Sequence, residues 1–69
     1  MQISVEEMQE IIRDDMKARG LNQQQLADEI FGVHQPDIST ALNDCPNYAV
    51  AEHYGFARKK IVVFEKIDE

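Results

Sequence analysis

The stretch from Leu21 to Asp44 constrains the fold most, because it has the pattern of two short helices separated by a single glycine. Asn22 is a good N-cap, and the apolar residues after it recur at helical spacing. Gly32 tolerates the left-handed backbone of a tight turn. Pro36 falls in the first turn of the second helix, where its missing N–H costs nothing. The stretch therefore predicts a helix-turn-helix.

The second of these predicted helices carries polar groups on its outer side. Short or planar polar side chains can hydrogen-bond the edges of DNA bases. Those on this side are Gln35, Ser39, Thr40 and Asn43. Ala27 lies where the two helices would cross, and its small side chain allows close approach. Gln23 opens the first helix, where free N–H groups favour phosphate.

At these residues the chain resembles the helix-turn-helix of the phage lambda repressor and Cro-like family. The likeness covers Val5 to Asp44 and depends on Leu21, Asn22, Gln23, Leu26, Ala27, Asp28, Gly32, Val33, Gln35 and Ile38. It implies that the third helix reads the major groove and that the glutamines opening the second and third helices cooperate at the DNA. The DNA-binding positions it carries over are Gln23, Gln35, Pro36, Asp37, Ser39, Thr40 and Asn43.

Two positions depart from the pattern of that family. Phe31 stands between Ile30 and Gly32, which makes the turn one residue longer than usual. Asp44 occupies a place that is often held by glycine. Both departures bear on the angle at which the third helix would meet DNA.

The segment before this motif predicts a helix from about Val5 to Arg19. Ser4 and Glu7 form a capping-box pattern at its start, and Gly20 is a good stop at its end. Its apolar stripe is expected to pack against the next two helices.

The segment after Asp44 leaves its secondary structure open at one place. Residues 48–54 fit either a strand alternation or a short fourth helix, and the helix is favoured. The β-branched and aromatic run from Ile61 to Phe64 predicts a strand, which needs a partner. The candidates are residues 48–54 in a hairpin, the Gln2–Ser4 arm, or the same strand of a second subunit.

A chain of 69 residues predicts one domain, spanning 1–69, with a small core. The expected fold is mainly α: a helix-turn-helix domain of three or four helices over 5–44, followed by a C-terminal strand or hairpin in the region 58–67. Oligomerisation is a natural source of further stability. No membrane span or export leader is recognisable, so a cytoplasmic protein is expected.

No enzyme, cofactor or metal site is expected. Cys45 lies 11 residues after His34 and 8 before His53, and these spacings match no paired-ligand pattern. The chain has no glycine-rich phosphate loop and no nucleophile with a recognisable base.

Charge opposes the DNA interpretation. The chain has 7 basic and 13 acidic residues, a net charge of −6, and Leu21–Asp44 contains no Lys or Arg. Basic side chains supply most non-specific DNA affinity. The ones that could flank the reading helix are Lys17, Arg19, Arg58, Lys59 and Lys60. Alternatively, Lys17 and Arg19 only offset the helix dipole. In that case Arg58, Lys59 and Lys60 only keep the end of a strand from pairing with another chain.

Two hypotheses follow. The first is a sequence-specific transcriptional regulator, a repressor of the phage or mobile-element type. It would bind a partly palindromic double-stranded DNA operator as a homodimer, with Ile61, Val62, Val63 and Phe64 in the dimer interface. The second is an acidic helix-turn-helix module that binds a protein, such as an antirepressor, an antitoxin-like factor or an inhibitor of a nucleic-acid enzyme.

Overall fold

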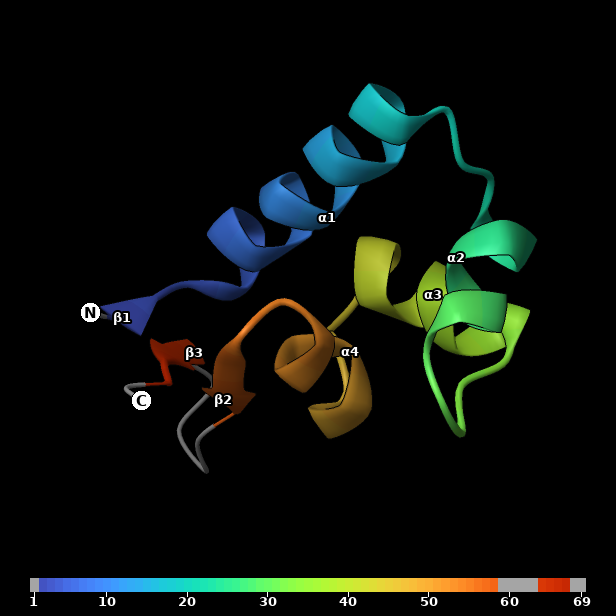
Figure 1. Cartoon of the computed structure of the whole chain (residues 1–69). Helices are drawn as coiled ribbons and strands as arrows, with labels where there is room; N and C mark the ends of the chain where they lie inside the picture. Colours follow the sequence, from blue (N-terminus) through green and yellow to red (C-terminus); the bar gives the residue numbers. More distant parts are fainter. Residues whose placement is uncertain (1, 59–63, 68–69) are drawn as a thin grey trace.

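The computed structural model describes residues 2–58 and 64–67, and it arranges them as helices flanked by a small sheet (Figure 1). The elements in chain order are β1 (Gln2–Ile3), α1 (Val5–Arg19), α2 (Gln23–Glu29), α3 (Gln35–Asn43), α4 (Tyr48–His53), β2 (Phe56–Arg58) and β3 (Phe64–Lys66). The predicted fold class, mainly helical with a C-terminal hairpin, is confirmed.

The ends of α1 lie where the sequence predicts them. The Ser4 hydroxyl accepts a hydrogen bond of 3.1 Å from the backbone N–H of Glu7, which satisfies one of the free donors of the first turn. Gly20 ends the helix in the left-handed conformation, with φ of 66°.

Local caps also define α2 and α3. The Asn22 side chain accepts from the Gln25 N–H at 2.8 Å, and the Gln25 side chain accepts from the Asn22 N–H at 2.9 Å. At the start of α3, the Asp37 carboxylate accepts from the His34 N–H at 2.9 Å. Gly32 has φ of 78°, so its predicted positive φ is confirmed.

The core lies where the helices and the sheet meet. Its fully buried large side chains include Met8, Ile12, Leu26, Ile38, Val50 and Phe64. Helix α1 lies against the C-terminal end of α3, where the Gln9 amide donates to the Asp44 carbonyl at 2.6 Å and the Arg13 guanidinium donates to the Leu42 carbonyl. One core therefore joins the helix-turn-helix to the sheet.

Strand β3 lies at the centre of the antiparallel sheet, whose order is β1-β3-β2. Phe64 is opposite Ile3 on one side and opposite Arg58 on the other. Of the predicted strand Ile61–Phe64 the structure describes only Phe64, where the N-terminal arm, one of the three partners considered, pairs as β1, and β2 of the same chain pairs on the other side. Residues 48–53 form the short helix that the sequence favoured.

The predicted dimer interface needs correction at Phe64. Its side chain is fully buried in the core of its own chain, so it is not a surface residue that a second copy could cover. The physical reason is that β3 already has a strand on each side. Ile61, Val62 and Val63 lie outside the described residues.

Candidate nucleic-acid interface

The outer face of α3 presents polar side chains, as predicted. Gln35, Pro36, Thr40 and Asn43 are exposed and Ser39 is half-buried. Two of these side chains are already used within the helix. The Thr40 hydroxyl donates to the Pro36 carbonyl and the Asn43 amide donates to the Ser39 carbonyl, both at 2.9 Å.

Gln35 differs from these residues. Within the described part of the chain, its side-chain amide makes no hydrogen bond. An unengaged primary amide has both a donor and an acceptor available, which is what bidentate pairing with adenine requires. Gln35 is therefore the residue of α3 best suited to contact a base.

Asp37, carried over by resemblance as a DNA-binding position, also has a structural role. Its carboxylate caps the start of α3 through the His34 N–H. A negative charge at this position is favoured by the helix dipole. This hydrogen bond helps to hold the start of α3 in place. Gln23, in contrast, is half-buried at the first position of α2.

Arg19 lies between two carboxylates. Its guanidinium is 2.7 Å from Asp15 of α1 and 2.8 Å from Glu29 at the end of α2. Its charge is thus offset within the protein, and it ties α1 to α2. Lys17, in the same turn of α1, is exposed. Of the two cations predicted here for phosphate contact, Lys17 is the one outside the ion pairs found among the described residues.

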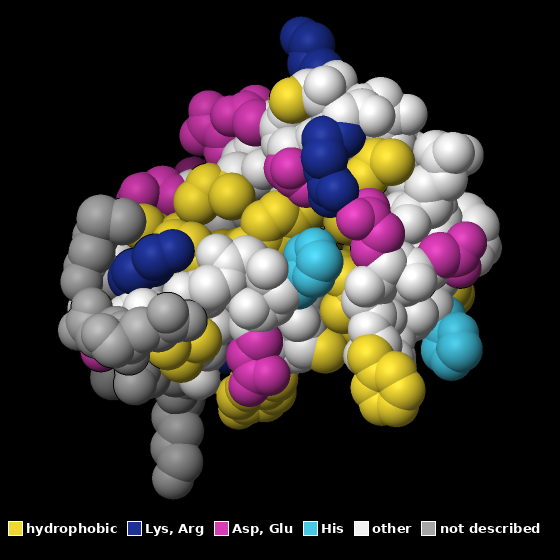
Figure 2. Space-filling model, viewed as in Figure 1, with side chains coloured by type: hydrophobic (Ala, Val, Ile, Leu, Met, Phe, Trp, Pro, Cys, Tyr) yellow, Lys and Arg dark blue, Asp and Glu magenta, His cyan; other side chains and the backbone are white. Residues whose placement is uncertain are grey.

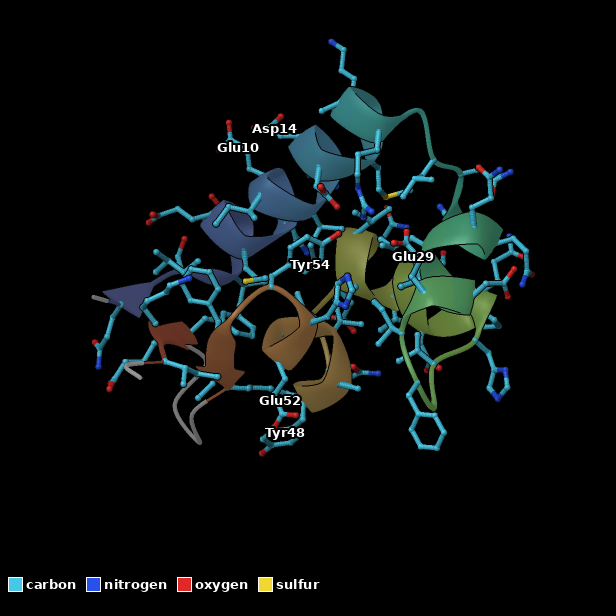
Figure 3. The ribbon with its side chains drawn as sticks, in the orientation of Figure 1. Glu10, Asp14, Glu29, Tyr48, Glu52 and Tyr54 are labelled. Carbon is cyan, nitrogen blue, oxygen red and sulfur yellow. The ribbon has the colours of Figure 1, made fainter. Side chains whose placement is uncertain are left out.

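Asp15 is the centre of this connection. It accepts from Arg19 and, at 2.7 Å, from the hydroxyl of Tyr54, which follows α4. The hydrogen bond from Arg19, and then that from Tyr54, lower the pKa of Asp15 below its usual value of 3.8. Burial and the bond to Asp15 raise the pKa of Tyr54 well above its usual range. The phenol therefore remains protonated and acts as a donor. Figure 3 shows Tyr54 in the central part of the molecule, between α1 and α4.

Arg58 is the third predicted phosphate contact that the structure describes, after Lys17 and Arg19. It ends β2, and its guanidinium carbon lies 5.2 Å from the centre of the Tyr48 ring. Lys59 and Lys60 lie outside the described residues. Tyr48 was not predicted as a functional residue, because nothing in the local sequence relates it to Arg58, ten positions later.

Phe31 is the most exposed large apolar side chain, with a relative exposure of 100%. Its neighbours Ile30 and Val33 are buried, and Gly32 with its positive φ turns the chain between them. The extra residue of the turn, which the sequence revealed, therefore points its ring into solvent.

Acidic side chains gather over α1 on the face shown in Figure 2. Glu10 and Asp14 are labelled there along the same helix in Figure 3. Such a surface repels phosphate, so a DNA duplex would have to approach another side of the molecule.

In residues 2–58 and 64–67, no three His, Cys, Asp or Glu side chains lie so that they could bind a metal ion. No helix in the same part of the chain is long and apolar enough to cross a membrane.

Comparisons with protein-family models, with curated proteins and with solved structures find no match.

Proposed function

We propose that this protein binds double-stranded DNA as a sequence-specific transcriptional regulator, with α3 as the reading helix. The observation that carries the proposal is the exposed, unengaged Gln35 amide at the first position of α3, in a unit whose helices are both capped. The caps fix the backbone of the helix that carries Gln35, and its free amide can pair with a base edge.

The resemblance to the lambda repressor and Cro-like family supports a repressor of the phage or mobile-element type. A homodimer on a partly palindromic site is the corresponding assembly. Two copies would also double the number of available cations, which matters for a chain with a net charge of −6. Strand β3 (Phe64–Lys66) has a strand of its own chain on each side, so a second copy would not pair with these three residues.

The charge distribution defines how the binding should behave. Few cations are available for phosphate, so affinity for random duplex should be low and its dependence on salt shallow. Base contacts from α3 must then supply a large share of the affinity for an operator. A protein of this kind would discriminate well but hold non-operator DNA weakly.

The proposal is tested by selecting duplexes from a random pool and titrating the enriched duplex against a scrambled one at several salt concentrations. Gln35→Ala should lose the preference for the enriched duplex. Gln24→Ala is the matched control, because Gln24 is exposed on α2 and its amide is bound to Asp28 at 2.9 Å. Failure to enrich any duplex would contradict the proposal.

Phe31 favours a second candidate function, an acidic helix-turn-helix module that binds a protein. Aromatic side chains, including phenylalanine, are enriched in the buried cores of protein interfaces, so an exposed phenylalanine suits contact with a partner. Leu21–Asp44 contains acidic residues and no cation, so the partner would have a basic surface, as nucleic-acid enzymes do. Antirepressors, antitoxin-like factors and enzyme inhibitors belong to this class.

Phe31→Ser separates the two candidates. For a DNA-binding regulator it should leave the affinity for the enriched duplex unchanged, while Gln35→Ala lowers it. For a protein-binding module the wild type should enrich no duplex. A protein partner should then be retained by the wild type and by Gln35→Ala but lost by Phe31→Ser.

A further inference from the structure

The corner between α4 and β2 holds an arginine against an aromatic ring. Tyr48 is the first residue of α4, and it is 57% exposed. The Arg58 guanidinium lies over its ring at 5.2 Å from the centroid. Attraction between a cation and the face of an aromatic ring restricts where the guanidinium can lie, although the ring does not neutralise its charge.

The other described arginines are already bound. Arg19 is paired with Asp15 and Glu29, and Arg13 donates to the Leu42 carbonyl. The ion pairs found among residues 2–58 and 64–67 do not include Arg58. Its planar guanidinium is therefore charged, restrained and available, and this shape suits a phosphate better than a lysine ammonium does.

The location of this pair relates it to the reading helix. Helix α4 follows α3 after a four-residue connection, 44–47, and the two helices are neighbours in Figure 1. A helix inserted in the major groove has a phosphate backbone on each side of the groove. Residues just beyond the end of such a helix are placed to meet that backbone.

We propose that Tyr48 is a positioning residue that holds Arg58 for a phosphate of the DNA backbone. This inference depends on the proposed function and deepens it, because it assigns the sequence-independent contact to the α4–β2 corner. Glu52 limits the contact. It is exposed one helical turn after Tyr48, and Figure 3 shows the two side chains next to each other. Its carboxylate would repel the same phosphate.

The test is a salt titration of the enriched duplex with the full-length protein. Arg58→Ala should reduce the slope of log affinity against log salt by about 0.9 for each bound copy of the protein, the value for one phosphate contact. Tyr48→Ala should reduce affinity and slope in the same direction but less. Tyr48→Phe keeps the ring and should behave as the wild type does.

Lys66→Ala is the matched control for these variants. Lys66 also lies over an aromatic ring, at 5.3 Å from the centroid of Phe56, but its ammonium lies beside Gly55, just before β2, whereas Arg58 ends that strand and lies against Tyr48. Its removal also deletes one positive charge. A smaller change of slope than that of Arg58→Ala is expected, because this cation is not held against Tyr48.

Glu52→Gln provides a test that a folding defect cannot imitate. Removing the carboxylate should tighten binding at low salt by roughly two- to fivefold, the range of a weak surface charge interaction, and the gain should fade at high salt. In a protein that already carries Arg58→Ala, Glu52→Gln should still relieve the repulsion of the phosphate. The gain in affinity should be smaller there, because the contact between Arg58 and the phosphate is absent.

Three results would overturn the inference. If the wild type binds the enriched duplex while Tyr48→Ala and Glu52→Gln both match it, the corner is not at the DNA and the proposed function stands. If Tyr48→Phe is as weak as Tyr48→Ala, the hydroxyl acts and the ring does not position Arg58. If no duplex is enriched, the proposed function and this inference fail together.

Discussion

The α2–α3 unit and the α4–β2 corner differ in how they are built and in what they offer a partner. The α2–α3 unit is held by caps between residues three apart, such as Asn22 with Gln25, and it contains no cation. The corner depends on contact between Tyr48 and Arg58, and it presents a positive charge. The polar groups proposed to read bases and the positive charge are thus separated in this molecule, so a substitution can alter one property without the other.

Asp15 of α1 connects these two regions. It accepts from Tyr54, which follows α4, and from Arg19, which also binds Glu29 at the end of α2. The position of the reading helix relative to the corner therefore depends on a small polar network as well as on the shared core.

The largest expected effect comes from the shared core. Phe64→Ala should cost about 3–5 kcal/mol of unfolding free energy, because it removes a fully buried aromatic ring at the centre of the sheet. Urea denaturation followed by circular dichroism measures it, with Phe64→Leu as the milder control. Both regions should unfold in one transition. A helical signal that survives after the sheet has unfolded would show that the two regions are independent.

The next effect is confined to the α2–α3 unit. Gly32→Val should destabilise by about 1–3 kcal/mol, since a β-branched residue is strained at φ of 78°. An added Cβ would meet nothing within 4 Å, so the cost comes from the backbone alone. Thermal unfolding of this variant should be compared with that of Gly32→Asn, which tolerates the conformation better. Equal stability of the Val and Asn variants would contradict this explanation.

A comparison of Gln35→Ala with Arg58→Ala sharpens the functional contrast. Gln35→Ala should cost on the order of 1–3 kcal/mol at one base-pair position. Arg58→Ala should weaken all sequences alike and make the salt dependence shallower. Affinities for a set of single-base variants of the enriched duplex distinguish the two patterns. Equal losses on specific and random DNA for Gln35→Ala would remove its role in reading bases.

The smallest effect concerns the network that joins the regions. The pKa of Asp15 is lower in the folded protein than its usual value of 3.8. The ionised Asp15 carboxylate therefore contributes fully to stability above pH 3.8, and this contribution is lost as the pH falls through the pKa of the folded state. Asp15→Asn should therefore be less stable than the wild type at pH 7, and the difference should shrink below pH 3.8. Arg19 and Asp15 are 41% and 28% exposed, so the difference should be small and should weaken in salt. Urea denaturation across this pH range measures it, and a difference independent of pH would exclude the ionised carboxylate as its cause.

The sequence by itself determined the helices of the N-terminal two thirds. Ser4, Gly20, Asn22 and Gly32 act on backbone groups within a few residues of themselves, so their effects are visible in the order of residues. The same local logic identified the outward face of α3 and the additional turn residue Phe31. It also favoured a helix at residues 48–53, where the choice between strand and helix depended on a short pattern.

Only the tertiary structure decided which groups are occupied and which are free. In the sequence, Arg19 is one of several cations near the helix-turn-helix. The structure places it in an ion pair with Glu29, ten residues away. The partners of β3 could not be chosen among three candidates, because strand pairing joins segments far apart and a strand's own pattern does not specify its neighbour. Tyr48 and Arg58 meet for the same reason: a periodic pattern assigns a side chain to a face of its element, whereas the packing of the elements determines what that face contacts.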